Sequence, residues 1–471
     1  MTDSRNETPI VLPMLNQLLD ANEHESFRKA LYSYSDRCVR QNVRRLTELP
    51  FEVEEVPWYQ SGRFVVDPSV RPASFLSYAT ADYYIQDAAS LLPLAVLDPR
   101  PSDMVCDLCA SPGGKASAIA ERLGPNGFLL ANESIRSRVD VLRYSLARTG
   151  NPCFAVSSYD PEDLANLVPR SFDAVLVDVP CSGQTLVGRN KREGNAFSEN
   201  QIEHCVLRQQ RILQSAIQLL KLGGRLVYST CTFALEENES QIQWLQEQYP
   251  DAWEPIEPMG LEPWRSSVQS GCYRLWPHRD RCAGGFVSGI RLVKELEFAP
   301  KALGSRGVKQ PVISISEKTK QRAELDKQKS VQEMLDVLGT FKNAATTRRQ
   351  GVSQCMTPGV QQAIEEFRLV SMEPMAVLIE TGNHFVPTQG LALLDKEFFT
   401  PHRTLELVED QAKLFASGSS LAFGPSAGQS NMRVVGGWTI ATWNGRPLGW
   451  CKVLSHRLNN HLPPWARLNI R

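Results

Sequence analysis

The sequence predicts an α/β protein with a Rossmann-like parallel sheet at its centre. From about Asp103 to Glu247, short apolar runs alternate with amphipathic stretches, as they do in repeated strand–helix units around such a sheet. A glycine-containing loop follows the first predicted strand, and cysteines follow two later ones. Because open α/β sheets bind their ligands at the carboxyl ends of the strands, we expect the functional site at these positions.

Five apolar runs predict the strands of this core: Met104–Leu108, Gly127–Ala131, Phe154–Ser157, Ala174–Val179 and Arg225–Thr230. Apolar residues at helical spacing predict four helices: Lys115–Arg122, Ser137–Arg148, Ile202–Leu220 and Glu237–Gln248. The alternation of the two sets favours parallel strands joined by crossover helices.

A chain of 471 residues is too long for one domain. We predict a small N-terminal α+β lobe over residues 1–78 and the core over residues 79–298. The lobe carries a basic cluster of four arginines: Arg37, Arg40, Arg44 and Arg45. Residues 299–350 are predicted to form a basic linker, because residues 301–350 contain 11 Lys or Arg and 5 Asp or Glu. Such a charge fits a solvated connector as well as contact with RNA phosphates.

Residues 351–471 are predicted to form a compact, β-rich C-terminal module. Strand candidates are Met375–Glu380 and Gly437–Trp443, with glycine and proline between them. The formal net charge of the whole chain is -1, so any affinity for nucleic acid must come from local patches. The polar start of the chain and its short apolar runs, such as Leu91–Leu97, predict a cytoplasmic protein without a membrane partner. Eleven cysteines, an odd number, fit reduced thiols in that compartment.

The loop after the first strand has the composition of a ligand-binding loop. Its residues are Cys109, Ala110, Ser111, Pro112, Gly113, Gly114 and Lys115. Small residues before a helix let backbone N–H groups approach a ligand closely. Glu133 follows the next strand about 20 residues later, the offset at which an acid accepts hydrogen bonds from ribose hydroxyls. The loop therefore predicts a cofactor that contains a nucleoside.

Three other interpretations of this loop fit less well. A Walker phosphate loop requires Gly where Cys109 stands and Ser or Thr where Ala116 stands, and a dinucleotide fingerprint requires three spaced glycines. Cys106 and Cys109 have CxxC spacing, but no second pair lies nearby, so we predict no metal site.

Two cysteines are expected at the carboxyl edge of the sheet. Cys181 follows a strand that ends near Asp178, and Cys231 follows the strand that ends at Thr230. A single free cysteine at a strand end is commonly a small buried apolar residue. Two thiols and a carboxylate at one edge instead indicate covalent catalysis with acid–base assistance.

Together these motifs resemble the RNA (cytosine-5) methyltransferases of the NOL1/NOP2/Sun family, in the bacterial branch that modifies ribosomal RNA. The resemblance covers roughly Val39–Leu292. The matching segments are Tyr84–Asp87 with Ser90, Cys109–Lys115, Leu130–Glu133, Asp178–Gly183, Tyr228–Thr232, Glu237–Glu239, Pro277–Arg279 and Gly284–Phe286. Near the C-terminus, Gly445–Lys452 and Asn459–Pro463 resemble the PUA-like RNA-binding module of the same branch.

The resemblance implies a class I methyltransferase core that uses S-adenosylmethionine to form 5-methylcytosine in RNA. Carried over by motif, Cys231 is the nucleophile, Cys181 assists product release and Asp178 assists catalysis. The implied donor contacts are the loop Cys109–Lys115, Glu133, Asp160 and Asp178. Ribosomal RNA is the preferred partner, and the N-terminal lobe over residues 1–78 is expected to bind RNA. The protein is expected to be a monomer.

The RNA target stays open at this point. After Cys181 the chain reads Gln184-Thr185-Leu186, where many members of the family have a glycine-rich segment. A transfer RNA methyltransferase, a ribosome assembly factor without the chemistry, and a methyltransferase acting on protein or small molecules all remain as alternatives. The pair of cysteines favours an RNA methyltransferase over the last two alternatives, and it does not identify the RNA.

Overall fold

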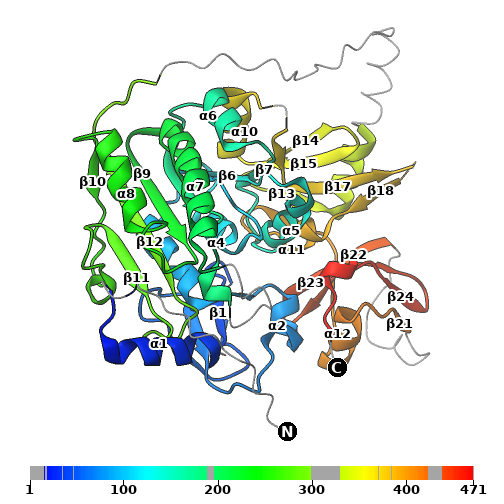
Figure 1. The fold of residues 1–471 in the computed structure, drawn as a ribbon. Coiled ribbons are helices and arrows are strands. Elements are labelled where there is room, and N and C mark those ends of the chain that lie inside the picture. The colour runs from blue at the N-terminus through cyan, green and yellow to red at the C-terminus, as the bar shows by residue number, and fades with distance from the viewer. Residues whose placement is uncertain are drawn as a thin grey trace.

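The computed structural model describes residues 15, 18–33, 36–45, 47–187, 196–298, 329–369, 371–382, 384–422 and 437–469. Its largest sheet has the order β10-β12-β9-β8-β5-β6-β7-β16, and β11 pairs with β12. Figure 1 shows this core in cyan and green, with the yellow and red C-terminal sheets beside it. The predicted α/β core is confirmed.

The centre of this sheet is parallel and contains the five predicted strands. They are β5 (Met104–Asp107), β6 (Phe128–Asn132), β7 (Phe154–Ser157), β8 (Phe172–Asp178) and β9 (Leu220–Thr230). Antiparallel strands that we did not predict extend it on both sides: β12 (Gly285–Leu292), β10 (Trp253–Pro255), β11 (Cys272–Leu275) and, beside β7, the short β16 (Glu373–Pro374). The carboxyl ends of β5, β6, β8 and β9 therefore share one edge.

The predicted core helices are also present, and none of their ends is shifted by more than three residues. They are α4 (Gly114–Arg122), α5 (Arg136–Ala147), α7 (Glu199–Leu219) and α8 (Glu239–Gln248). Two further helices are α3 (Leu92–Leu97) and α6 (Pro161–Leu167). The sequence explains α6, because Asp160 caps its first turn and Pro161 occupies the first helical position.

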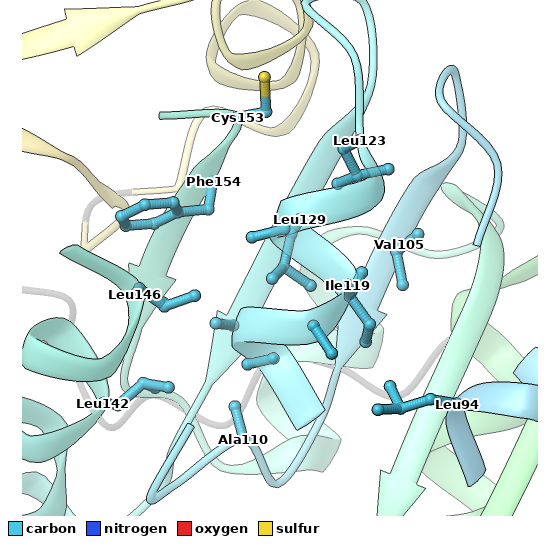
Figure 2. Packing of buried hydrophobic residues seen from close by; sticks show 14 of the residues in the cluster. Leu94, Val105, Ala110, Ile119, Leu123, Leu129, Leu142, Leu146, Cys153 and Phe154 are labelled. Atoms are coloured by element: carbon cyan, nitrogen blue, oxygen red, sulfur yellow. The ribbon is translucent and has the colours of Figure 1, made fainter. Parts of the chain in front are cut away.

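Side chains of α4 and α5 pack against the sheet at β5 and β6. Figure 2 shows Ile119 from α4 and Leu146 from α5 close to Val105 and Leu129 of the strands. All four side chains are completely buried. Burial of this kind contributes about 1.5–3 kcal/mol for each large aliphatic side chain. This packing holds the loop between β5 and α4 on a rigid base.

The N-terminal lobe is a helix, α1 (Ala21–Ser33), and a sheet of order β2-β3-β1-β4. The strands are β1 (Cys38–Gln41), β2 (Val53–Glu55), β3 (Gly62–Val65) and β4 (Tyr83–Ile85), and a one-turn helix, α2 (Leu76–Ala79), precedes β4. The lobe thus reaches past residue 78, where we placed its boundary.

The arginines of this lobe are bonded inside the protein and do not form a free basic patch. Arg40 is almost fully buried and donates to Gln86, to the carbonyl of Gly114, and to Ser117 and Glu121 of α4. Arg44 pairs with Glu397, and Arg45 donates to two backbone carbonyls. The expectation that this cluster serves an RNA-binding lobe is not supported, because these cations join the lobe to the rest of the chain.

Replacement of Arg40 by methionine is expected to destabilise the protein by about 3–5 kcal/mol, because it leaves Glu121 buried without its cation. Urea unfolding followed by tryptophan fluorescence measures the loss. The double variant R40M/E121M should recover part of the loss, since it buries no unpaired charge. Equal stability of the single and double variants would contradict this explanation.

The C-terminal half starts earlier than predicted. Residues 329–338 are helical and bury Val331, Leu335 and Leu338. They are followed by β13 (Gly339–Phe341) and β14 (Ala345–Arg349). The prediction of a basic linker is therefore wrong for residues 329–350, because buried apolar side chains fold this stretch onto its neighbours. Residues 299–328 of the predicted linker lie outside the described residues.

Two further sheets make up most of this half. The first, of order β14-β15-β17-β18, contains β15 (Val352–Met356), β17 (Ala376–Thr381) and β18 (His384–Pro387). The second, of order β20-β22-β23-β24-β21, contains β20 (Thr404–Glu406), β22 (Gly437–Trp443), β23 (Arg446–Val453), β24 (Arg457–Asn460) and β21 (Leu421–Ala422). Its helix is α12 (Glu409–Ala416), and the remaining elements are α10 (Pro358–Phe367), α11 (Gln389–Leu393) and β19 (Phe399–Pro401).

Specific contacts fix the C-terminal sheet to the core. Arg446 forms an ion pair with the fully buried side chain of Asp82. The ring of Trp465 stacks on that of Tyr144 in α5, with 4.7 Å between centroids. Both strands predicted for this half are present, Gly437–Trp443 with the same bounds. In the part of the chain that is described, no helix has the length and apolar character needed to cross a membrane.

Candidate active site

Cys181 and Cys231 come together at the carboxyl edge of the sheet. Their Sγ atoms lie 2.8 Å apart, and the backbone N–H of Cys231 donates to Sγ of Cys181 at 3.2 Å. Cys181 follows the end of β8 and Cys231 follows the end of β9, and these strands are parallel neighbours. The predicted convergence of the two thiols is therefore present in the structure.

Asp178, the last residue of β8, lies beside this pair. Its carboxylate accepts hydrogen bonds from Nζ of Lys115 at 2.8 Å and from Oγ of Ser229 at 2.7 Å. Burial acts to lower the pKa of Lys115, but the carboxylates of Asp178 and Asp107 outweigh it and raise that pKa. Lys115 thus remains a cation, and it fixes Asp178 as an acceptor.

Two pockets meet at Lys115 and Asp178. The first, which we call the thiol pocket, has an empty volume of about 630 Å³ and is lined by Cys231, Thr185, Leu186 and Phe286 as well as these two residues. The second, the loop pocket, has about 620 Å³ and is lined by the segment 109–112, Gly114, Tyr84 and Asp107. One ligand in each pocket would meet the other at the Lys115–Asp178 pair.

Asp107 is a site residue that we did not single out in the sequence. It ends β5 and lines the loop pocket, and its Oδ1 atom is buried without a hydrogen-bond partner among the described residues. Burial, followed by the charge of Asp178, raises the pKa of Asp107 to about 7. Its position at the strand end was the signal available in the sequence. A buried carboxylate with one unpartnered oxygen fits a ligand that carries an ammonium group.

Two other residues, Glu133 and Asp160, were predicted to contact the donor. Glu133 is buried next to the loop, where its carboxylate pairs with Arg138 at 3.1 Å and accepts from the N–H of Ile135. Neither Glu133 nor Asp160 is in the lining of the loop pocket. Asp160 caps α6 and forms an ion pair with Arg211 at 3.5 Å. The structure therefore offers a structural role for Asp160.

The thiol of Cys181 is held in its protonated form. Hydrogen bonding to Cys231 and then burial raise the pKa of Cys181 well above its usual value. Burial likewise raises the pKa of Cys106 and of Cys109. Among the residues that the structure describes, no group of three or more His, Cys, Asp or Glu side chains is arranged to hold a metal ion.

Comparisons with known proteins show the family of the chain. Residues 94–291 match the family described as 16S rRNA methyltransferase RsmB/F, and residues 402–468 match the PUA domain of methyltransferase RsmF. A ribosomal RNA small subunit methyltransferase F from Klebsiella pneumoniae is 30% identical over 446 residues, which cover 91% of this chain and 89% of the relative. One from Shewanella piezotolerans is 28% identical and covers 92% of each chain. A solved methyltransferase homologue from Pyrococcus horikoshii, 28% identical, superposes with a TM-score of 0.50 and covers 58% of this chain and 92% of its own.

The fold and the loop pocket define the protein as an S-adenosylmethionine-dependent methyltransferase. The unpartnered Oδ1 atom of Asp107 and the loop Cys109–Lys115 fit this donor, which carries an ammonium group and a nucleoside. The chain belongs to the RsmB/F family of 16S rRNA methyltransferases, and its C-terminal sheet is the PUA domain of that family.

Proposed function

We propose that the protein methylates carbon 5 of a cytosine in ribosomal RNA through a covalent bond between Cys231 and the base. The observation that carries this proposal is the contact of Cys231 with Cys181 beside the Lys115–Asp178 pair, where the two pockets meet. Ribosomal RNA is proposed because the curated relatives are named for it.

Carbon 5 of cytosine is a weak nucleophile, so the base must be activated before it accepts a methyl group. Addition of the Cys231 thiolate to carbon 6 moves the electrons of the carbon 5–carbon 6 double bond into the ring and makes carbon 5 enamine-like. Asp178, oriented by Lys115 and Ser229, accepts a hydrogen bond from the exocyclic amino group of the base, and the cation of Lys115 offsets the negative charge that develops on the ring. When bound, S-adenosylmethionine supplies an electrophilic methyl group.

Release reverses the addition. A base removes the proton from carbon 5, the carbon 5–carbon 6 double bond re-forms, and the bond between Cys231 and carbon 6 breaks with its electrons returning to sulfur. The thiol of Cys181, in contact with that sulfur, donates a proton to it and later regains one from solvent. This contact supports the proposed part of Cys181 in the covalent step.

In the same proposal the loop Cys109–Lys115, Glu133 and Asp107 hold the donor, and the PUA domain binds the RNA. A ribosomal RNA substrate implies that the protein works in the cytoplasm. Bisulfite sequencing of ribosomal RNA from a deletion strain tests the proposal. One cytosine should lose its protection from conversion, and reintroduced wild-type protein should restore it. Unchanged ribosomal RNA together with a lost site in transfer RNA would contradict the proposed substrate.

Donor affinity is expected to depend on the ionisation of Asp107. Because the pKa of Asp107 is raised to about 7, this carboxylate gains a proton as the pH falls below 7 and no longer attracts the ammonium group of the donor. Affinity for S-adenosylmethionine should fall about tenfold per pH unit below 7. Calorimetric titration from pH 5.5 to 8.5 measures this slope. D107N should bind weakly at every pH with a flat profile, and a wild-type profile that is also flat would contradict this role.

A further inference from the structure

The loop that carries Cys181 is held on both sides by one pair of buried side chains. Gln209 of α7 donates from Nε2 to the carbonyl of Pro180 at 3.1 Å and to Oε2 of Glu237 at 2.9 Å. The backbone N–H of Ser182 donates to the same Glu237 oxygen at 2.9 Å, and Oγ of Ser182 donates to the other at 2.5 Å. The residues before and after Cys181 are thus tied to Gln209 and Glu237.

Both of these polar side chains are buried, and burial of a polar group costs free energy of folding because the group loses its hydration. The side chains of Glu237 and Gln209 are completely buried, and Oε1 of Gln209 has no hydrogen-bond partner among the described residues. A buried carboxylate is tolerated only where hydrogen bonds compensate its lost hydration. The hydrogen bonds to the Glu237 carboxylate come from Ser182 and Gln209, which are neutral donors close to Cys181. These bonds compensate the lost hydration of the carboxylate without neutralising its charge.

The second glutamate of the same segment shows the contrast. Glu239 is equally buried, but it forms an ion pair with Arg274 and accepts from Ser266, away from the cysteines. Its partners make it a structural residue of the sheet edge. Glu237 and Glu239 are therefore equally buried glutamates, of which the first bonds to the loop of Cys181 and the second serves as its control.

We propose that Glu237 and Gln209 are positioning residues that hold the thiol of Cys181 against the sulfur of Cys231 and so set the rate at which the methylated base is released. The proposal rests on the proposed function, in which Cys181 gives its proton to the departing sulfur of Cys231. Neither positioning residue touches the base, and neither takes part in the attack on it. The negative charge of Glu237 also favours the protonated form of the Cys181 thiol, since it adds to the causes that raise the pKa of Cys181.

The experiment compares full-length wild-type protein with E237Q, Q209M and E239Q in single-turnover reactions with S-adenosylmethionine and ribosomal RNA. Denaturing gels follow the formation and the decay of the covalent protein–RNA adduct. In E237Q an amide N–H replaces one acceptor, and in Q209M both hydrogen bonds of the amide are lost. Decay of the adduct should slow by about 10- to 100-fold in both variants, because a small misplacement of a catalytic group has an effect of this size. Formation should stay within about threefold of wild type, a difference of less than 1 kcal/mol in the barrier.

The E239Q variant separates positioning from general stability. It should melt at a lower temperature than wild type and still release the RNA at the wild-type rate. Equal decay rates in wild type, E237Q and Q209M would overturn the inference, and so would equal slowing of formation and decay in either variant. C181A is run alongside: if it accumulates adduct while E237Q and Q209M do not, the inference fails and the proposed function stands. If C181A accumulates none, the assignment of release to Cys181 fails and the inference with it, whereas the covalent role of Cys231 is tested separately by C231A.

Discussion

The variant Cys231→Ala is expected to lose methylation completely. The thiolate of Cys231 forms the bond to carbon 6 that makes carbon 5 reactive. The described residues that line the thiol pocket include no second thiol that could replace it. Loss of a covalent nucleophile lowers turnover by about 10⁴-fold or more. Incorporation of labelled methyl groups from S-adenosylmethionine into ribosomal RNA measures the effect.

Two controls make this result specific. The Cys231→Ala variant should still bind S-adenosylmethionine with wild-type affinity, because the lining of the loop pocket does not include Cys231. Cys451→Ala, at a buried thiol in β23 of the C-terminal sheet, should retain activity. Methylation by Cys231→Ala at more than about one tenth of the wild-type rate, a loss of less than 1.4 kcal/mol, would contradict the covalent role.

The variant Cys181→Ala is expected to trap the protein on its RNA. Attack by Cys231 needs no group from Cys181, so the adduct and the methyl transfer should form. Release should slow by about 10²-fold or more, in the range that loss of a positioned proton donor produces. A band of protein plus RNA should then persist on a denaturing gel. Wild-type protein, which completes its turnover with S-adenosylmethionine and releases the RNA, should show no such band.

The same experiment distinguishes the two cysteines. The double variant Cys181→Ala/Cys231→Ala should give no band, because the nucleophile is missing. If Cys181→Ala were merely inactive, with neither product nor adduct, the assignment of release to Cys181 would be wrong. If the double variant retained the band, the bond to RNA would come from another residue.

Much of the core could be predicted from the sequence, because it depends on local patterns. The strands that end at Asp107, Asp178 and Thr230 are apolar runs bounded by polar residues, and parallel strands bring such ends to one edge. This rule was sufficient to place Cys181 and Cys231 at one edge. The actual contact of their sulfurs depends on the turn geometry after each strand, which periodicity does not show.

The features that were missed depend on tertiary pairing. Four arginines in the N-terminal lobe suggested a basic surface, yet Arg40 is buried among partners from α4 that lie about 80 residues away in the chain. The helix over residues 329–338 was not predicted, because the excess of Lys and Arg over residues 301–350 indicated a linker. Asp107 and Glu237 became distinctive only when their burial and hydrogen bonds were known. Composition describes which charges are present, whereas the fold decides which of them are free.

The most direct test of the account is to locate the bond between protein and RNA. Ribosomal RNA that contains 5-fluorocytosine blocks removal of the group at carbon 5 and should trap wild-type protein after methyl transfer. Digestion with trypsin and mass spectrometry should place the nucleotide on the peptide of residues 226–265, at Cys231. A nucleotide on the peptide of residues 171–189, at Cys181, or trapping at neither peptide, would contradict the account.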